Sequence, residues 1–139
     1  MPGVDQPRSL GYLFDLIYTR DMWMHRLDIC PATGRAMVID DEYDRRTVAL
    51  VVRDLALKAQ HGLAGRSAIL DLTGSAGEVY QIGAVSNPSA RVEIDAITFC
   101  ILTSGRTAAA NVLAAAVVIR GDRAFGEEVI RYCENRVLY

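Results

Sequence analysis

The residues best suited to chemistry lie near the N-terminus, where Asp21, His25 and Asp28 follow one another at spacings of four and three. On a helix these spacings put the three side chains on one face. A carboxylate and an imidazole four residues apart can both ligate one divalent metal, and a further polar group can orient the imidazole. We therefore predict Asp21 and His25 as metal ligands, supported by Asp28 and Tyr18. A structural Asp–His pair on a partly buried helix is the alternative interpretation.

Such a pair is incomplete, because a catalytic zinc site usually has three protein ligands and a water molecule. The second histidine, His61, ends the second predicted helix, and an antiparallel pairing of the two helices would place it far from His25. An interaction of His61 with the helix dipole explains it better. The third ligand is therefore unknown, and a second subunit is one source for it. The sequence also lacks the GxSxG and phosphate-loop motifs of common enzyme classes.

Composition and charge limit the partners and the cell compartment expected for this protein. The 15 basic and 17 acidic side chains give a net charge of −2, which predicts no nucleic-acid partner. No apolar run approaches the length of about 18 residues that spans a bilayer, and the N-terminus lacks a secretory signal. The three cysteines, Cys30, Cys100 and Cys133, are far apart in the chain, as expected of reduced thiols. We predict a cytoplasmic protein without a membrane partner.

The rhythm of apolar residues predicts an α+β fold in which two N-terminal helices precede an antiparallel or mixed sheet packed by helices. With 139 residues, 51% of them hydrophobic, the chain is expected to form a single domain, 1–139. The predicted elements, in order, are a helix 10–29 stopped by Pro31, a helix from Asp40 or Asp41 to about 60, strands 67–72, 78–82 and 91–94, a helix from Asp95 to 102, a helical turn 108–113, a buried strand 115–119 and a helix from Asp122 to about 135.

The first predicted helix is more apolar than one sheet requires, because apolar residues occur on more than one of its faces. Phe14 and Tyr18 share the row of Asp21 and His25. An uncovered apolar surface of this size is a liability on a monomer. We therefore predict a homodimer formed through this helix.

The segment RDMWMHRLD (residues 20–28), followed by ATGR (32–35), resembles a signature of the mycothiol-dependent maleylpyruvate isomerase-like proteins, which are mostly actinobacterial. The later segments DAITFC (95–100), SGR (104–106) and GD (121–122) are similar to the C-terminal domain of that family. These matches follow the family order over roughly residues 10 to 135.

The resemblance implies that residues 1–35 correspond to the last helix of a DinB-like four-helix bundle and that 36–139 form a sterol-carrier-like α+β part. In the family the bundle holds a divalent metal, typically zinc, and Asp21 and His25 match two of its ligands. The third, a histidine on an earlier helix, has no counterpart in this sequence, because most of the bundle is missing. Mycothiol is the implied thiol cosubstrate.

Three functions follow. The first is a truncated or stand-alone relative with a partial metal site and no independent catalysis. The second is a mycothiol-dependent isomerase or transferase whose metal site is completed by a second subunit. The third is a binding module for an apolar small molecule, because sterol-carrier-like folds often enclose a cavity; Phe99, Arg106 and Phe125 are its candidate lining. The ligand partner expected of the chain is thus a small apolar molecule or a thiol. A filled core is the alternative interpretation of these residues.

Overall fold

The computed structural model describes residues 10–12, 14, 18–84 and 87–137. The chain divides into two compact units, of which the first ends at Val38 and the second begins at Ile39. The sequence predicts one domain with an internal division near residue 35.

The first unit contains the short helix α1 (Leu10–Tyr12) and the helix α2 (Thr19–Ala32). The expectation that Pro31 stops the helix is wrong, because α2 continues through Pro31 to Ala32. A proline in the last turn removes only one helical hydrogen bond. The backbone N–H and the hydroxyl of Thr33 both donate to the carbonyl of Ile29, at 3.0 and 2.8 Å, and hold this turn closed.

The second unit begins with the long helix α3 (Asp41–Gly62), whose start matches the prediction. The carboxylate of Asp40 accepts hydrogen bonds from the N–H groups of Glu42 and Tyr43, at 3.2 and 2.7 Å. These bonds satisfy two of the N–H groups that every helix leaves unpaired at its N-terminus. Acidic side chains in the first turn of α3 favour the same start through the helix dipole.

Four strands follow in a mixed sheet, which confirms the predicted α+β class. The central strand β1 pairs with β2 in the predicted antiparallel hairpin and with β3 in parallel, and β3 pairs with β4 in antiparallel fashion. The predicted burial of the last strand is wrong: it lies at an edge of the sheet, and Val118 and Arg120 are exposed. The bounds, in sheet order, are β2 (Val79–Gly83), β1 (Ser67–Thr73), β3 (Ala90–Asp95) and β4 (Val117–Gly121).

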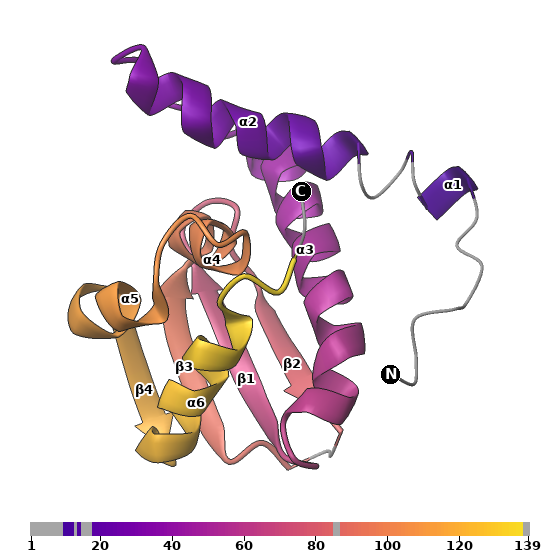
Figure 1. The fold of residues 1–139 in the computed structure, drawn as a ribbon, viewed down its shortest axis with the longest axis vertical. Helices are drawn as coiled ribbons and strands as arrows, with labels where there is room; N and C mark the ends of the chain where they lie inside the picture. The colour runs from indigo at the N-terminus through magenta and orange to yellow at the C-terminus, as the bar shows by residue number, and fades with distance from the viewer. Residues whose placement is uncertain (1–9, 13, 15–17, 85–86, 138–139) are drawn as a thin grey trace. The chain divides into compact units, whose positions relative to one another are not determined.

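Helices cover one face of this sheet, with α3 over β2 and α6 (Arg123–Cys133) over β3 and β4 (Figure 1). Side chains alternate between the two faces of a strand. Alternate residues of β1 and β3 therefore fill the core beneath the helices, and each is at most 4% exposed. They are Ala68, Leu70, Leu72, Ala90, Val92 and Ile94.

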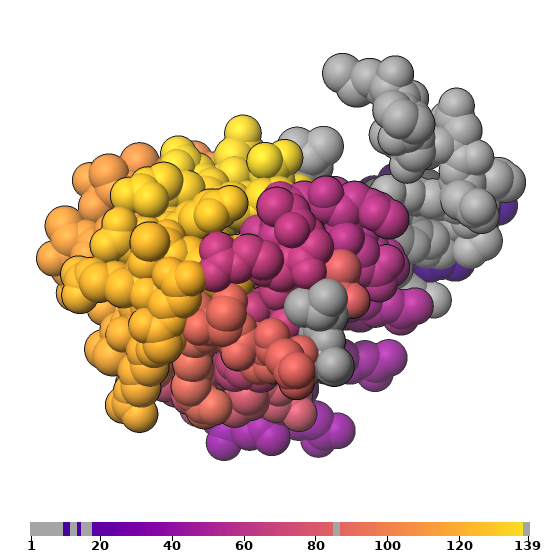
Figure 2. Space-filling model, turned by 90° about the horizontal axis from the view of Figure 1, so that it is seen from below, coloured from indigo at the N-terminus to yellow at the C-terminus, as the bar shows by residue number. Residues whose placement is uncertain are grey.

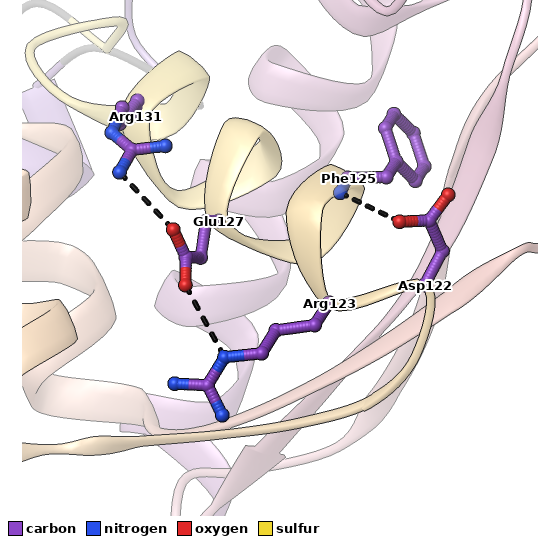
Figure 3. Close-up of polar contacts among 5 residues, drawn as sticks. All are labelled: Asp122, Arg123, Phe125, Glu127 and Arg131. Atoms are coloured by element: carbon purple, nitrogen blue, oxygen red, sulfur yellow. Dashed lines mark hydrogen bonds and ion pairs between the residues drawn. The ribbon is translucent and has the colours of Figure 1, made fainter.

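Two of the remaining helices, α4 (Ala96–Thr103) and α6 (Arg123–Cys133), begin after the two aspartates that the sequence singles out as caps. Asp95 accepts a hydrogen bond from the N–H of Thr98 at 2.9 Å, and Asp122 accepts one from that of Phe125 at 3.0 Å (Figure 3). The N–H of Phe125 and the guanidinium of Arg66 hold the pKa of Asp122 below its usual 3.8. The helices are α4 (Ala96–Thr103), α5 (Ala109–Ala115) and α6 (Arg123–Cys133).

Hydrogen bonds join three segments at the end of the sheet where β1 and β3 begin. The N–H of Ser89 donates to the carbonyl of Ser67 at 3.0 Å, and the N–H of Asp122 donates to that of Ser89 at 2.9 Å. Seen from below in Figure 2, the start of α6 lies beside the segment that leads into β3. Residues far apart in the sequence thus form one continuous surface at this end.

Candidate functional site

The predicted ligand pair comes together on α2. Nε2 of His25 lies 3.5 Å from Oδ2 of Asp21, and Nδ1 of the same ring lies 3.8 Å from Oδ2 of Asp28. The three side chains are exposed to solvent at 35% for Asp21, 59% for His25 and 46% for Asp28. The imidazole is thus placed between two carboxylates, one at each ring nitrogen.

This geometry fits two ligands of a tetrahedral metal. Two ligand atoms that each lie about 2.0–2.2 Å from one zinc ion are roughly 3.3–3.6 Å apart. The 3.5 Å between Asp21 and His25 falls in this range. A carboxylate at the other ring nitrogen is the usual partner that orients a ligating histidine, and Asp28 lies there.

The third ligand is not supplied by the part of the chain that the structure describes, in which no cluster of three or more His, Cys, Asp or Glu side chains suits a metal ion. His61 is exposed in the last turn of α3 and belongs to the other unit. The described residues therefore supply two ligands, Asp21 and His25, and the metal site stays a prediction.

Exposed apolar side chains lie along one side of the Asp–His pair. At 100° per residue, Tyr18, Met22 and Ile29 fall with the three polar residues in an arc of about 120°. Their exposed fractions are 50%, 71% and 57%. The ring of Phe14 lies 5.5 Å from that of Tyr18, centroid to centroid, and is 58% exposed. We call the set Tyr18, Asp21, Met22, His25, Asp28 and Ile29 the α2 face.

Met22 and Ile29 were missed as members of this site. The sequence reasoning followed the row of Asp21 and His25 and counted Met22 and Ile29 only as part of an apolar helix. Met22 precedes His25 by three residues and Ile29 follows it by four, and these spacings place both on the flank of the same helix face. Trp23 and Met24, on the other side of α2, are buried.

The candidate pocket of the C-terminal part has a different character. Phe99 and Phe125 are 0% and 1% exposed, whereas Arg106 is exposed. The guanidinium of Arg66 lies over the Phe125 ring. Both phenylalanines are thus packed core residues, and the grooves described below have other linings.

A groove of about 370 Å³ lies at the start of α3, beside the turn that leads into β2. Its lining contains both charge signs, with Asp41 and Glu42 next to Arg45 and Arg46. Glu78 completes it and accepts a hydrogen bond from the hydroxyl of Tyr80 at 3.2 Å. Burial and then the charge of Glu78 raise the pKa of Tyr80 to about 12. This balance of charge favours no single class of ligand.

The two cysteines of the second unit, Cys100 and Cys133, do not form a reactive centre. Cys100 and Cys133 are 0% exposed, and burial raises the pKa of the Cys133 thiol to about 12. A thiol with so high a pKa is not a nucleophile at neutral pH. Cys30, on α2, is partly exposed.

Comparison with known proteins leaves the resemblance a prediction, because no protein-family model matches the chain and no curated protein matches it. Among the described helices, none combines the length and the apolar character needed to cross a membrane.

Proposed function

We propose that this chain is a self-associating, metal-binding relative of the mycothiol-dependent maleylpyruvate isomerase-like proteins. One chain supplies half of a divalent-metal site and does not catalyse a reaction by itself. The observation that carries the proposal is the position of the Asp21–His25 pair on the α2 face, next to exposed apolar side chains. A surface that covers this face meets the ligand pair and the apolar residues together.

The occupant we propose is the α2 face of a second copy. Two-fold pairing brings identical surfaces together, so it juxtaposes two Asp21–His25 pairs and supplies four ligands. Four ligands complete a closed zinc site, with no position left for a substrate. A site of this kind is structural, which agrees with a chain that has no catalysis of its own.

A comparison of approximate free energies indicates that zinc binding, more than apolar contact, stabilises the proposed dimer. Burying a half-exposed Tyr, Met or Ile contributes roughly 1 kcal/mol, so three from each copy contribute about 6 kcal/mol. Association costs an estimated 4–15 kcal/mol, so apolar contact alone gives a weak dimer at best. Structural zinc in small peptides contributes about 10–16 kcal/mol at neutral pH, which makes the dimer zinc-dependent.

The test combines light scattering with elemental analysis of untagged protein. We expect a dimer with one zinc per two chains, and a monomer after chelation. Asp21→Asn with His25→Gln should abolish zinc binding and the dimer together. Met22→Glu should weaken the dimer, whereas Leu57→Glu, which changes another exposed apolar residue, on α3, should not. A zinc-loaded monomer, or a dimer that survives loss of both ligands, would contradict the proposal.

A further inference from the structure

The second face of the sheet carries charged side chains in a regular pattern. Arg91 and Arg120 are register partners on β3 and β4, and both belong to the strand positions opposite the core. Like charges directly opposite each other on neighbouring strands are destabilising unless something neutralises them. Each of these arginines has one acidic neighbour on the same face, Asp71 for Arg91 and Glu93 for Arg120.

The two ion pairs differ in geometry. Arg91 donates from Nε and Nη2 to the same oxygen of Asp71, at 3.0 and 2.5 Å. Nη2 of Arg120 is 3.6 Å from Glu93, beyond normal hydrogen-bond length, and its side chain is 69% exposed. An exposed pair at this distance contributes little. Arg120 therefore retains most of its capacity to bind an anion.

A groove of about 260 Å³ lies between these arginines and the segment that leads into β3. Arg91, Arg120 and Ser89 contribute its polar side chains, and Ile69 and Pro88 contribute apolar surface. Neither Asp71 nor Glu93 lines it. Arg91 is paired with Asp71, so the loosely paired Arg120 supplies most of the positive charge at the groove.

Ser89 is positioned to donate into this groove. Its Oγ accepts a hydrogen bond from Nη2 of Arg66 at 3.2 Å, which leaves the hydroxyl proton to be donated elsewhere. Gly121 permits the close approach of the end of β4 to Ser89, since a Cβ at residue 121 would lie 2.6 Å from the Ser89 carbonyl oxygen. That contact fixes the strand end next to Arg120 against Ser89.

A buried hydroxyl lies beside the same segment. Ser67 is 0% exposed, and its Oγ has no hydrogen-bond partner among the described residues. Its backbone carbonyl accepts the N–H of Ser89. Buried polar groups are nearly always paired, so an unpaired one next to a groove is consistent with a polar ligand or water that reaches this end of the sheet.

We propose that this groove binds a small phosphate monoester. Arg91 and Arg120 hold the phosphate, the Ser89 hydroxyl donates to one of its oxygens, and Ile69 and Pro88 contact the organic group. Two guanidinium groups and a hydroxyl supply donors from three directions, which suits a tetrahedral dianion better than a planar carboxylate. The dianion also offsets the charge of Arg120, whose pairing with Glu93 is long and exposed.

The experiment is an NMR titration of the full ¹⁵N-labelled chain with phenyl phosphate, inorganic phosphate and phenol in separate arms. We expect saturable shifts of the amides of Ser89, Arg91, Arg120 and Gly121 with phenyl phosphate. Inorganic phosphate should shift the same amides more weakly, because it lacks the organic group, and phenol should not shift them. Equal affinity for phenyl phosphate and inorganic phosphate would overturn the predicted apolar contact.

Two variants separate this groove from general attraction of anions. Arg120→Gln should weaken phenyl phosphate binding by about tenfold, as expected for loss of one charge-assisted contact. Arg131→Gln makes the same change of net charge on α6 and should leave the affinity unaltered. Arg120 is exposed, so its variant is expected to keep the wild-type spectrum elsewhere. Absence of saturable shifts at the groove, or equal weakening in both variants, would overturn the proposal.

Discussion

Arg66 lies over the ring of Phe125, with its Cζ atom 3.7 Å from the ring centroid. The same guanidinium donates to the carboxylate of Asp122, the residue that caps α6. The residue before β1 is thus joined to the first turn of α6 by a cation–π contact and an ion pair. Phe125 is 1% exposed, so the guanidinium covers one surface of a core side chain.

We predict that Arg66→Met lowers the free energy of unfolding. Methionine keeps the apolar stem but loses the cation–π contact, which contributes about 0.5–1 kcal/mol at such a site, and the exposed ion pair with Asp122, which contributes less than about 1 kcal/mol. Arg131→Met is the control, because it loses only an exposed pair with Glu127 (Figure 3) and should change stability by less than about 0.5 kcal/mol. Urea unfolding measures both. Equal effects of the two changes would show that the position of Arg66 over Phe125 has no energetic consequence.

Acid should destabilise the protein partly through Asp122. The folded state holds the pKa of this carboxyl below 3.8, chiefly through the N–H of Phe125 and then through Arg66. A group with a depressed pKa contributes its stabilisation in full above its unfolded pKa and loses it as the pH falls through the folded one. We therefore expect Asp122→Asn to reduce the loss of stability below about pH 4. Thermal melts from pH 7 to pH 2 check this; parallel curves for the two proteins would contradict it.

The sequence specified the elements of the second unit well because their signals are local. Asp40, Asp95 and Asp122 each cap the helix expected to follow, and the hairpin of β1 and β2 follows the alternation of their side chains. The prediction that Pro31 stops the first helix is wrong, because the effect of a proline depends on which turn of the helix it occupies. The edge position of β4 depends on strand order, which no local pattern encodes.

The two candidate sites also differ in whether a local sequence pattern reveals them. Asp21 and His25 are found from spacing alone, because a helix brings residues four apart together. The pair Arg91 and Arg120 was not found, because only the register of two distant strands places these residues opposite each other. The alternation of side chains along β3 indicates which face of the sheet Arg91 is on. It does not indicate which residue of the neighbouring strand lies opposite.

The cysteines should react with alkylating agents in a fixed order. Cys30 is partly exposed, whereas Cys100 and Cys133 are fully buried and the pKa of Cys133 is raised to about 12. We expect one cysteine per chain to react with iodoacetamide under native conditions and all three in urea. Cys30→Ser should leave no reactive thiol until the protein unfolds. Native labelling of Cys133, detected by mass spectrometry of peptides, would mean that α6 opens more readily than its packing implies.

Two glycines beside Arg66 should respond differently to substitution by alanine. Gly65 and Gly83 both have positive φ, +75° and +104°, so alanine is strained at either position. A Cβ at residue 65 meets nothing within 4 Å, whereas one at residue 83 would lie 2.2 Å from the carbonyl oxygen of Arg66.

We expect Gly65→Ala to cost about 1–2 kcal/mol, the strain of the left-handed conformation alone. Gly83→Ala should cost roughly 1–3 kcal/mol more, because the overlap is with backbone and can be relieved only by moving β1 away from β2. Urea unfolding gives both values, and amide exchange at Ser67 should accelerate in the Gly83 variant alone. Equal costs for the two variants would mean that the end of the β1–β2 ladder adjusts without loss of its register.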